Sequence, residues 1–323
     1  MLTCKLPSQT VEKGEGEHYA VPLDTHTLVL YYNKQFLREA GLLDADDKPV
    51  IGKGEQGFTA FLQKIKAAVL PGVAPLAMPS TRIDSVWLWW SLYNQIDGGG
   101  GFYNQEGSQA VFNNSQSLRA LEYINSLYTQ ELMPPDINDA FKMFYDGEAA
   151  VLITGVWETG AFEKEEGLEL GVVPIPVIYD HPAVWGDSHT LAIPAKGNMS
   201  PEKKEAAMVF ASWAVEHGVM WAEAGHVPSA NKVIGSQAFT EMKFRSDYAA
   251  TADYVAYWPR NIKQWSINEE IIAQFEKMIY KEQTPAQALA QAVDGINLKL
   301  TNGKAGGTPG RRMMRISLPV CGL

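Results

Sequence analysis

Two short Asp-x-His motifs bring together residue types that can hold polar ligands, metals or protons. The first is Asp24-Thr-His26 and the second is Asp187-Ser-His189. On a strand, the first and third residues of such a motif point to the same face. Zinc accepts carboxylate and imidazole ligands, so Asp187, His189 and His26 could bind it. A zinc site needs four ligands, and the sequence supplies no clear third and fourth ligand to either Asp-x-His pair. We therefore predict neither a metal site nor a cofactor.

A pair of carboxylates could instead hydrolyse a glycosidic bond. Asp24 and Glu158 are the candidates, because this chemistry needs two carboxyl groups that flank the bond. No surrounding motif specifies a glycosidase, and a carboxylate beside a tryptophan can equally bind sugar hydroxyls. A serine triad is not indicated, since no Gly-x-Ser-x-Gly motif occurs. We therefore expect no catalytic residue, with a carbohydrate-active hydrolase as the alternative.

Aromatic residues are more numerous than a core of this size needs, with nine tryptophans and thirteen tyrosines. A cleft lined by flat apolar faces that end in polar atoms would explain them. Sugar rings present C–H faces that pack on indole, whereas their hydroxyls need Asp, Asn, His or Arg in place of water. The tryptophans that flank polar segments are Trp87, Trp90, Trp157, Trp185, Trp258 and Trp265. Binding of a small polar ligand explains these residues better than catalysis.

The elements that position these residues are predicted from hydrophobic patterns. Residues 19–22 are apolar, 23–27 form a polar break, and 28–32 are β-branched or aromatic, as in a buried strand. Two apolar runs around such a break indicate a strand that leaves one sheet and enters another. Residues 184–194 repeat the pattern. A pair of crossover strands would form a hinge between two halves of the protein.

Helices and strands alternate along the rest of the chain, which favours the α/β class. We predict helices at 34–40, 58–70, 86–96, 115–130, 140–145, 200–217, 238–249, 265–280 and 284–299, and further strands at 74–78, 151–154 and 170–175.

Composition excludes several functions. The 323 residues suggest one or two domains. A net charge of -10 argues against binding to nucleic acid or anionic membranes. The two cysteines, Cys4 and Cys321, are expected to be unpaired, and no CxxC motif is present. No run is apolar enough to span a bilayer, and no signal peptide is visible.

The chain resembles the family 1 extracellular solute-binding proteins of ABC importers, the maltose-binding-protein-like group. The resemblance covers about residues 18–300. It is carried by YAVPLDTHTLVLYYNK (19–34), FYDGEAAVLITGVW (144–157), GVVPIP (171–176) and WGDSHTLAIPAKGNMSPEKKEAAMVFASW (185–213).

That resemblance implies a type II periplasmic-binding-protein-like fold, in which two α/β lobes joined by crossover strands hold an oligosaccharide between them. It also implies a monomeric binding protein rather than an enzyme, located outside the cell or in the periplasm, with ABC permease subunits as partners. A polyol or glycerol-phosphate is an alternative ligand, for which Arg82 and Arg260 would be the basic residues. The expected ligand contacts are Asp24, Trp157, Glu158, Asp187 and His189, with Trp87, Trp90, His226, Arg260 and Trp265 as looser matches.

The first crossover begins at residue 19, whereas family members begin with a signal peptide and most of their first lobe. We therefore expect a form truncated at its N-terminus. Its first lobe would be an incomplete remnant made of residues 1–25 and 187–236. Residues 26–186 and 237–300 would form the second lobe, followed by an irregular tail at 301–323.

Overall fold

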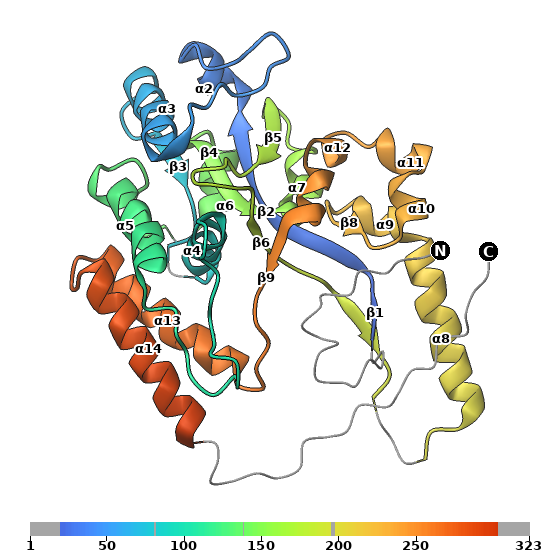
Figure 1. The fold of residues 1–323 in the computed structure, drawn as a ribbon. Coiled ribbons are helices and arrows are strands. Elements are labelled where there is room, and N and C mark those ends of the chain that lie inside the picture. The colour runs from blue at the N-terminus through green and yellow to red at the C-terminus, as the bar shows by residue number, and fades with distance from the viewer. Residues whose placement is uncertain (1–19, 81, 138, 195–197, 303–323) are drawn as a thin grey trace.

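A computed structural model describes residues 20–80, 82–137, 139–194 and 198–302 (Figure 1). Both cysteines lie outside these residues, and so do residues 1–19 of the expected lobe remnant and residues 303–323 of the predicted tail. The strands are β1 (Ala20–Pro22), β2 (Asp24–Asn33), β3 (Ala74–Ala77), β4 (Ala149–Gly155), β5 (Leu170–Pro174), β6 (Val184–Asp187), β7 (Thr190–Ala192), β8 (Val227–Pro228) and β9 (Val255–Tyr257).

Helices alternate with these strands, as the α/β class requires. The α-helices are α2 (Lys34–Glu39), α3 (Gly54–Ala68), α4 (Asp84–Gln95), α5 (Ser115–Thr129), α6 (Ala140–Tyr145), α7 (Thr159–Phe162), α8 (Pro201–Glu216), α9 (Gly218–Ala222), α10 (Asn231–Ile234), α11 (Gln237–Thr240), α12 (Arg245–Tyr248), α13 (Gln264–Ile279) and α14 (Pro285–Asn302). Two 3-10 helices, η1 (Val156–Glu158) and η2 (Ala249–Tyr254), complete the described elements.

Strand β2 runs through the middle of the molecule and changes its partners along its length (Figure 1). Its first two residues pair with β8, and the next two, His26 and Thr27, pair with β6. From Leu28 onward it lies between β4 and β5. Strand β1, just before it, pairs with β7 in a separate two-stranded sheet. The predicted passage of the chain from one sheet to another is therefore confirmed.

The two faces of β2 enter different cores, because successive side chains on a strand point to opposite sides. Leu28, Leu30 and Tyr32 pack into the larger hydrophobic cluster, together with α3, α4, α5, α13 and α14. Val29 and Tyr31 pack into the smaller one, with α6 and α12. Asp24 and His26 lie on the same face of β2 as Leu28, Leu30 and Tyr32, nearer the start of the strand.

Most predicted elements are confirmed, and three expectations are wrong. The polar break expected at 23–27 is absent, because β2 runs unbroken from Asp24 and β6 and β8 supply its partners. The single helix expected over 238–249 is divided into α11 and α12, since Phe244 adopts a left-handed backbone with φ of 72°. A right-handed helix cannot continue through such a residue. The segment predicted at 184–194 forms two strands, β6 and β7.

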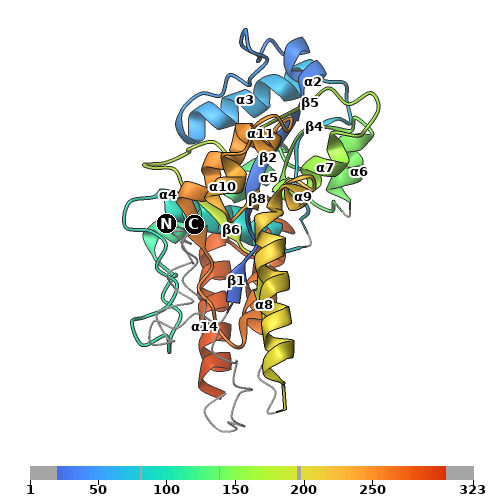
Figure 2. The same cartoon turned by 90° about the vertical axis from the view of Figure 1, so that its right-hand side faces the viewer.

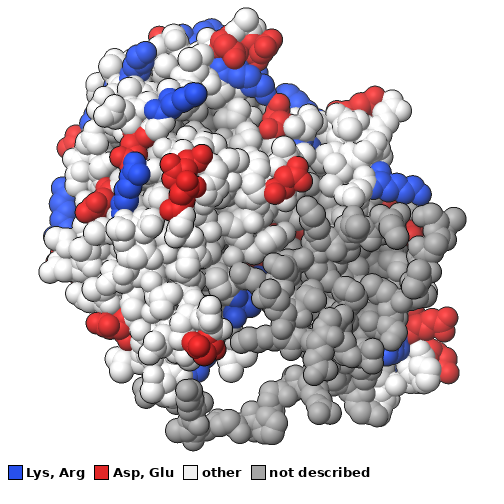
Figure 3. All heavy atoms as spheres, in the orientation of Figure 1, with Lys and Arg blue, Asp and Glu red and all other residues white. Residues whose placement is uncertain are grey.

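Helix α8 extends away from the sheet in both views (Figures 1 and 2). Ala211 is its only fully buried residue among those described, and Val209, Phe210 and Trp213 are exposed apolar side chains. Elsewhere, Lys and Arg side chains are scattered among Asp and Glu side chains on the face drawn in Figure 3.

Candidate functional site

The carboxylate of Asp24 is fully buried at the start of β2 and lies at the centre of a polar cluster. Its Oδ2 atom lies 2.6 Å from Nε1 of Trp221 and 2.8 Å from Nδ1 of His189. Its Oδ1 atom accepts the backbone N–H of His189 at 2.7 Å and lies 3.3 Å from Nδ1 of His26. The Nδ1 atom of His226 is 2.7 Å from Oδ2. The topology thus gathers three histidines around one carboxylate.

The environment of Asp24 keeps its carboxyl group ionised. Burial raises the pKa, but the close contacts with the rings of His226, His26 and His189 and the charge of His26 outweigh burial and hold the pKa well below its ordinary value of 3.8. A general acid must carry a proton at working pH. The environment of Asp24 therefore does not suit it to the acid role in the hydrolase alternative.

A second group, of aromatic rings, lies directly beside this cluster. Trp87 on α4 and Trp185 on β6 are stacked, with ring centroids 3.9 Å apart and planes at 16°. Trp157 on η1 meets both of them edge-on, and its ring centroid is 5.8 Å from that of His26. Trp87 and Trp157 are partly exposed. Indole faces thus stand next to the imidazole of the polar cluster.

The Gly-x-Trp turn after β4 places Trp157 in this position. A Cβ atom on Gly155 would lie 2.0 Å from Cζ3 of the Trp157 ring. Only glycine therefore lets the indole fold back over the end of the strand. The buried Nε1 atom of Trp185 has no hydrogen-bond partner among the described residues, and so one donor in the aromatic group is unused.

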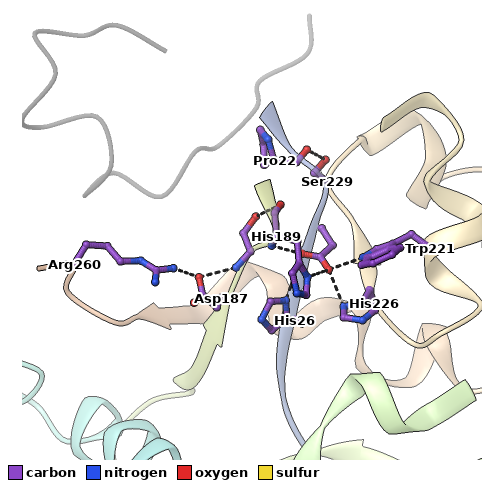
Figure 4. A network of polar contacts seen from close by, with 10 residues as sticks. Pro22, His26, Asp187, His189, Trp221, His226, Ser229 and Arg260 are labelled. Atoms are coloured by element: carbon purple, nitrogen blue, oxygen red, sulfur yellow. Dashed lines mark hydrogen bonds and ion pairs between the residues drawn. The ribbon is translucent and has the colours of Figure 1, made fainter. Parts of the chain in front are cut away.

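Asp187 lies at the end of β6, opposite His26 in the strand pairing. Its Oδ1 atom accepts the N–H of Ser188 at 2.8 Å and forms an ion pair with Arg260 (Figure 4). This pair adds charged hydrogen-bonding groups on the side away from Trp221.

The remaining sequence candidates lie elsewhere. Trp90 on α4 is buried in the larger hydrophobic cluster, and its Nε1 atom donates to the Ala256 carbonyl at 2.9 Å. Trp265 on α13 is 77% exposed. Neither residue belongs to the polar cluster or the aromatic group. Glu158 follows Trp157, and burial is the main cause that raises its pKa; its charged neighbours include Arg82 and Asp139.

Three side chains of the polar cluster and the aromatic group were not among the expected ligand contacts, namely His26, Trp185 and Trp221. Trp185 was singled out from sequence only as a tryptophan that flanks a polar segment. His26 could have been found from its place two residues after Asp24, which puts both on one strand face. Trp221 offers no such signal, since 197 residues separate it from the carboxylate that it contacts.

Asp84, at the start of α4, is a second buried carboxyl group, and it is poorly paired. Arg82 Nε lies 3.3 Å from its Oδ2 atom, but neither oxygen accepts a hydrogen bond from the described residues. Burial raises its pKa to about 6, and the charge of Arg82 offsets only part of that effect. At neutral pH this carboxylate therefore destabilises the fold.

Replacing Asp84 with asparagine is expected to stabilise the protein by about 2 kcal/mol at neutral pH, because the variant carries no charge to bury. The pKa of Asp84 is about 6 in the folded protein and 3.8 in the unfolded chain. The wild type therefore loses stability as the pH rises from 3.8 through 6 and the buried carboxyl group ionises. Urea unfolding of both proteins across the window measures the difference. A D84N variant less stable than the wild type above pH 6 would contradict the assignment.

Comparison with solved structures identifies the fold. The sugar-binding protein MalE from Xanthomonas citri aligns with a TM-score of 0.75 at 18% sequence identity, over 90% of this chain and 72% of that chain. The chain thus has the mixed α/β fold of the two-lobe, maltose-binding-protein-like periplasmic binding proteins, as the resemblance implied.

Residues 5–243 match the family described as bacterial extracellular solute-binding protein, and the chain belongs to that family. One relative is an uncharacterised ABC transporter extracellular-binding protein of Pyrococcus horikoshii, 27% identical over 181 residues. Another is the maltodextrin-binding protein MdxE of Bacillus subtilis, 26% identical over 175 residues. Each alignment covers 51% of this chain and 38% of the relative. Among the described residues, every helix is too short or too polar to cross a membrane.

Proposed function

We propose that this chain binds an oligosaccharide and delivers it to an ABC importer, without carrying out a reaction. The observation that carries the proposal is the group of Trp87, Trp157 and Trp185 beside the Asp24 and Asp187 clusters. Such a site offers apolar faces for the C–H side of a sugar and polar atoms for its hydroxyls. Relatives named as a maltodextrin-binding protein and an ABC transporter extracellular-binding protein support both parts.

In this proposal, one sugar ring lies against the partly exposed faces of Trp87 and Trp157. The unused Nε1 donor of Trp185, the exposed ring of His189 and the Asp187–Arg260 pair serve the hydroxyl groups. The ligand contacts both lobes and so stabilises the closed state, which the permease subunits recognise.

The alternative ligands are not supported. A phosphate group needs unpaired positive charge or a free helix N-terminus. Arg260 is already paired with Asp187, and Arg82 lies beside Asp84. The hydrolase alternative is also unsupported, since Asp24 is buried and held by its donors.

The pairing of strands supports the expected division into lobes. The partners of residues 20–25 all come from β7 and β8, whereas β2 from Leu28 onward pairs with β4 and β5. We propose that residues 1–25 and 187–236 belong to one lobe, and that 26–186 and 237–300 form the other. We also propose an extracellular or periplasmic monomer that does not bind nucleic acid.

Substituting alanine for Trp157 is expected to weaken sugar binding by about tenfold, since the stacking face is worth about 1.4 kcal/mol. Isothermal titration calorimetry with a series of maltooligosaccharides measures this change. The matched control is Trp213→Ala, because Trp213 is partly exposed on α8 and lies outside the site. Equal affinities of the W157A variant and the wild type would overturn the aromatic site. No heat from any sugar, or release of smaller sugars during incubation, would overturn the proposed function.

A further inference from the structure

We propose that Asp24, His26, His189 and His226 bind a divalent transition-metal ion, with Zn²⁺ as the best match. One ligand atom from each of these residues can be chosen so that all four lie within 4.8 Å of one another. Three nitrogens and one carboxylate oxygen form a donor set that suits Zn²⁺. This proposal departs from the expectation from sequence, in which neither Asp-x-His pair had a clear third and fourth ligand.

The distances within the cluster are close to those of a metal site. Bonds of about 2.0 Å in a tetrahedral site place the ligand atoms about 3.3 Å apart. The distances from the Asp24 oxygens to the three Nδ1 atoms are 2.7 Å for His226, 2.8 Å for His189 and 3.3 Å for His26. Small side-chain rotations would therefore admit an ion at the centre.

A buried nitrogen without a hydrogen bond provides an independent reason. The side chain of His226 is 7% exposed, and its Nδ1 atom lies 2.7 Å from Asp24 Oδ2. The contact does not have the geometry of a hydrogen bond, and Nδ1 has no hydrogen-bond partner among the described residues. A buried polar atom that points at a carboxylate without bonding to it is costly. A cation between the two atoms would satisfy both.

The donors around Asp24 are also more numerous than its oxygens can accept. Five N atoms lie within 3.3 Å of two oxygens: the backbone N of His189, Nε1 of Trp221, and the three imidazole Nδ1 atoms. A carboxylate offers about four lone-pair positions. One metal ion would instead be bound by all three imidazole Nδ1 atoms. The two remaining N–H groups then orient the carboxylate from the second shell.

The cluster is shielded on most sides and accessible from one. Asp24, His26 and His226 are buried, whereas the side chain of His189 is 53% exposed. Figure 4 shows the rings of His26, His189 and His226 gathered beside Trp221. An ion can enter past His189, which is also the ligand most free to rotate.

The test uses the full chain without a polyhistidine tag, stripped with EDTA and studied in the absence of sugar. Titration with ZnCl₂ is expected to show one ion bound per chain. Bound Co²⁺ is expected to give the strong visible absorption of a tetrahedral site. His189→Gln and His226→Gln are each expected to weaken Zn²⁺ binding at least about tenfold, as the loss of a ligand costs no less than the loss of a second-shell partner. The H189Q variant changes an exposed side chain, so the test does not depend on the folding of H226Q.

The matched control is His181→Gln, because His181 also pairs with an aspartate, Asp97, but on the surface. This variant is expected to bind Zn²⁺ as the wild type does. ZnCl₂ is expected to raise the melting temperature of the wild type and H181Q more than that of H189Q. Equal affinity of H189Q and the wild type, or absence of stoichiometric binding, would overturn the site. Neither result bears on sugar binding, since no sugar is present.

Discussion

Replacing Asp24 with asparagine is expected to lower the free energy of unfolding at neutral pH by about 3 kcal/mol, as for other buried pairs that lose one partner. The carboxylate accepts from Trp221 Nε1 and the His189 backbone, and the histidine rings surround it. An amide of the same shape has one oxygen instead of two and turns an N–H toward these donors. Urea unfolding of metal-free protein measures the loss.

The effect of Asp24 should depend on pH in a defined direction. Its folded pKa lies below the unfolded value of 3.8, so its contribution is complete above that value and is lost as the pH falls below it. The difference between wild type and D24N should therefore shrink in acid. The control is Asp97→Asn, which removes a carboxylate paired with a histidine at the surface and should change stability little. A D24N variant as stable as the wild type at neutral pH would show that the donors do not hold the carboxylate.

Substitution of Arg245 by methionine is expected to lower the free energy of unfolding by about 4 kcal/mol. The guanidinium is 2% exposed, and its Nε atom donates to the Ala222 carbonyl at 2.9 Å. It also donates to the carbonyls of Lys243 and Glu223 and pairs with Glu163. Methionine fills much of the volume but leaves three carbonyls and one carboxylate without their donor.

The matched control is Arg38→Met, because Arg38 pairs with Glu169 at 2.9 Å while both side chains are about half exposed. Water replaces the lost contact there, so stability should hardly change. Urea unfolding of both variants at one pH separates the two cases. Equal losses in R245M and R38M would rule out the buried carbonyl contacts as the source of the effect.

Local pattern was sufficient to predict the strands that bury one continuous run of residues. Residues 28–32 and 151–154 are examples, and β2 and β4 contain them. The hydrophobic pattern gave wrong predictions of secondary structure where contacts with residues distant in the sequence decide the local conformation. Asp24 and His26 have low strand propensity, yet β8 and β6 hold them in β2. Nothing local in 238–249 indicates that Phe244 takes a left-handed conformation.

Part of the candidate site could be predicted in the same way. The alternation of side chains along a strand predicts that Asp24 and His26 lie on one face. The resemblance gave His189 and His226 as expected ligand contacts, but it did not predict that both contact Asp24. Trp221 reaches Asp24 only through the fold. Trp90 was expected to contact ligand, but α4 is covered on nearly all sides, so Trp90 lies in the larger hydrophobic cluster. Whether these side chains contact a ligand stays a prediction.

The single face of β2 that carries Asp24 and His26 at one end carries Leu28, Leu30 and Tyr32 at the other. Insertion or deletion of one residue between them would turn one half of the strand over while the other half kept its register. The polar pair would then point at the smaller core, and His189, after β6, and His226, before β8, would lose their carboxylate. This stretch of chain is therefore expected to tolerate substitutions in evolution far more readily than changes in its length.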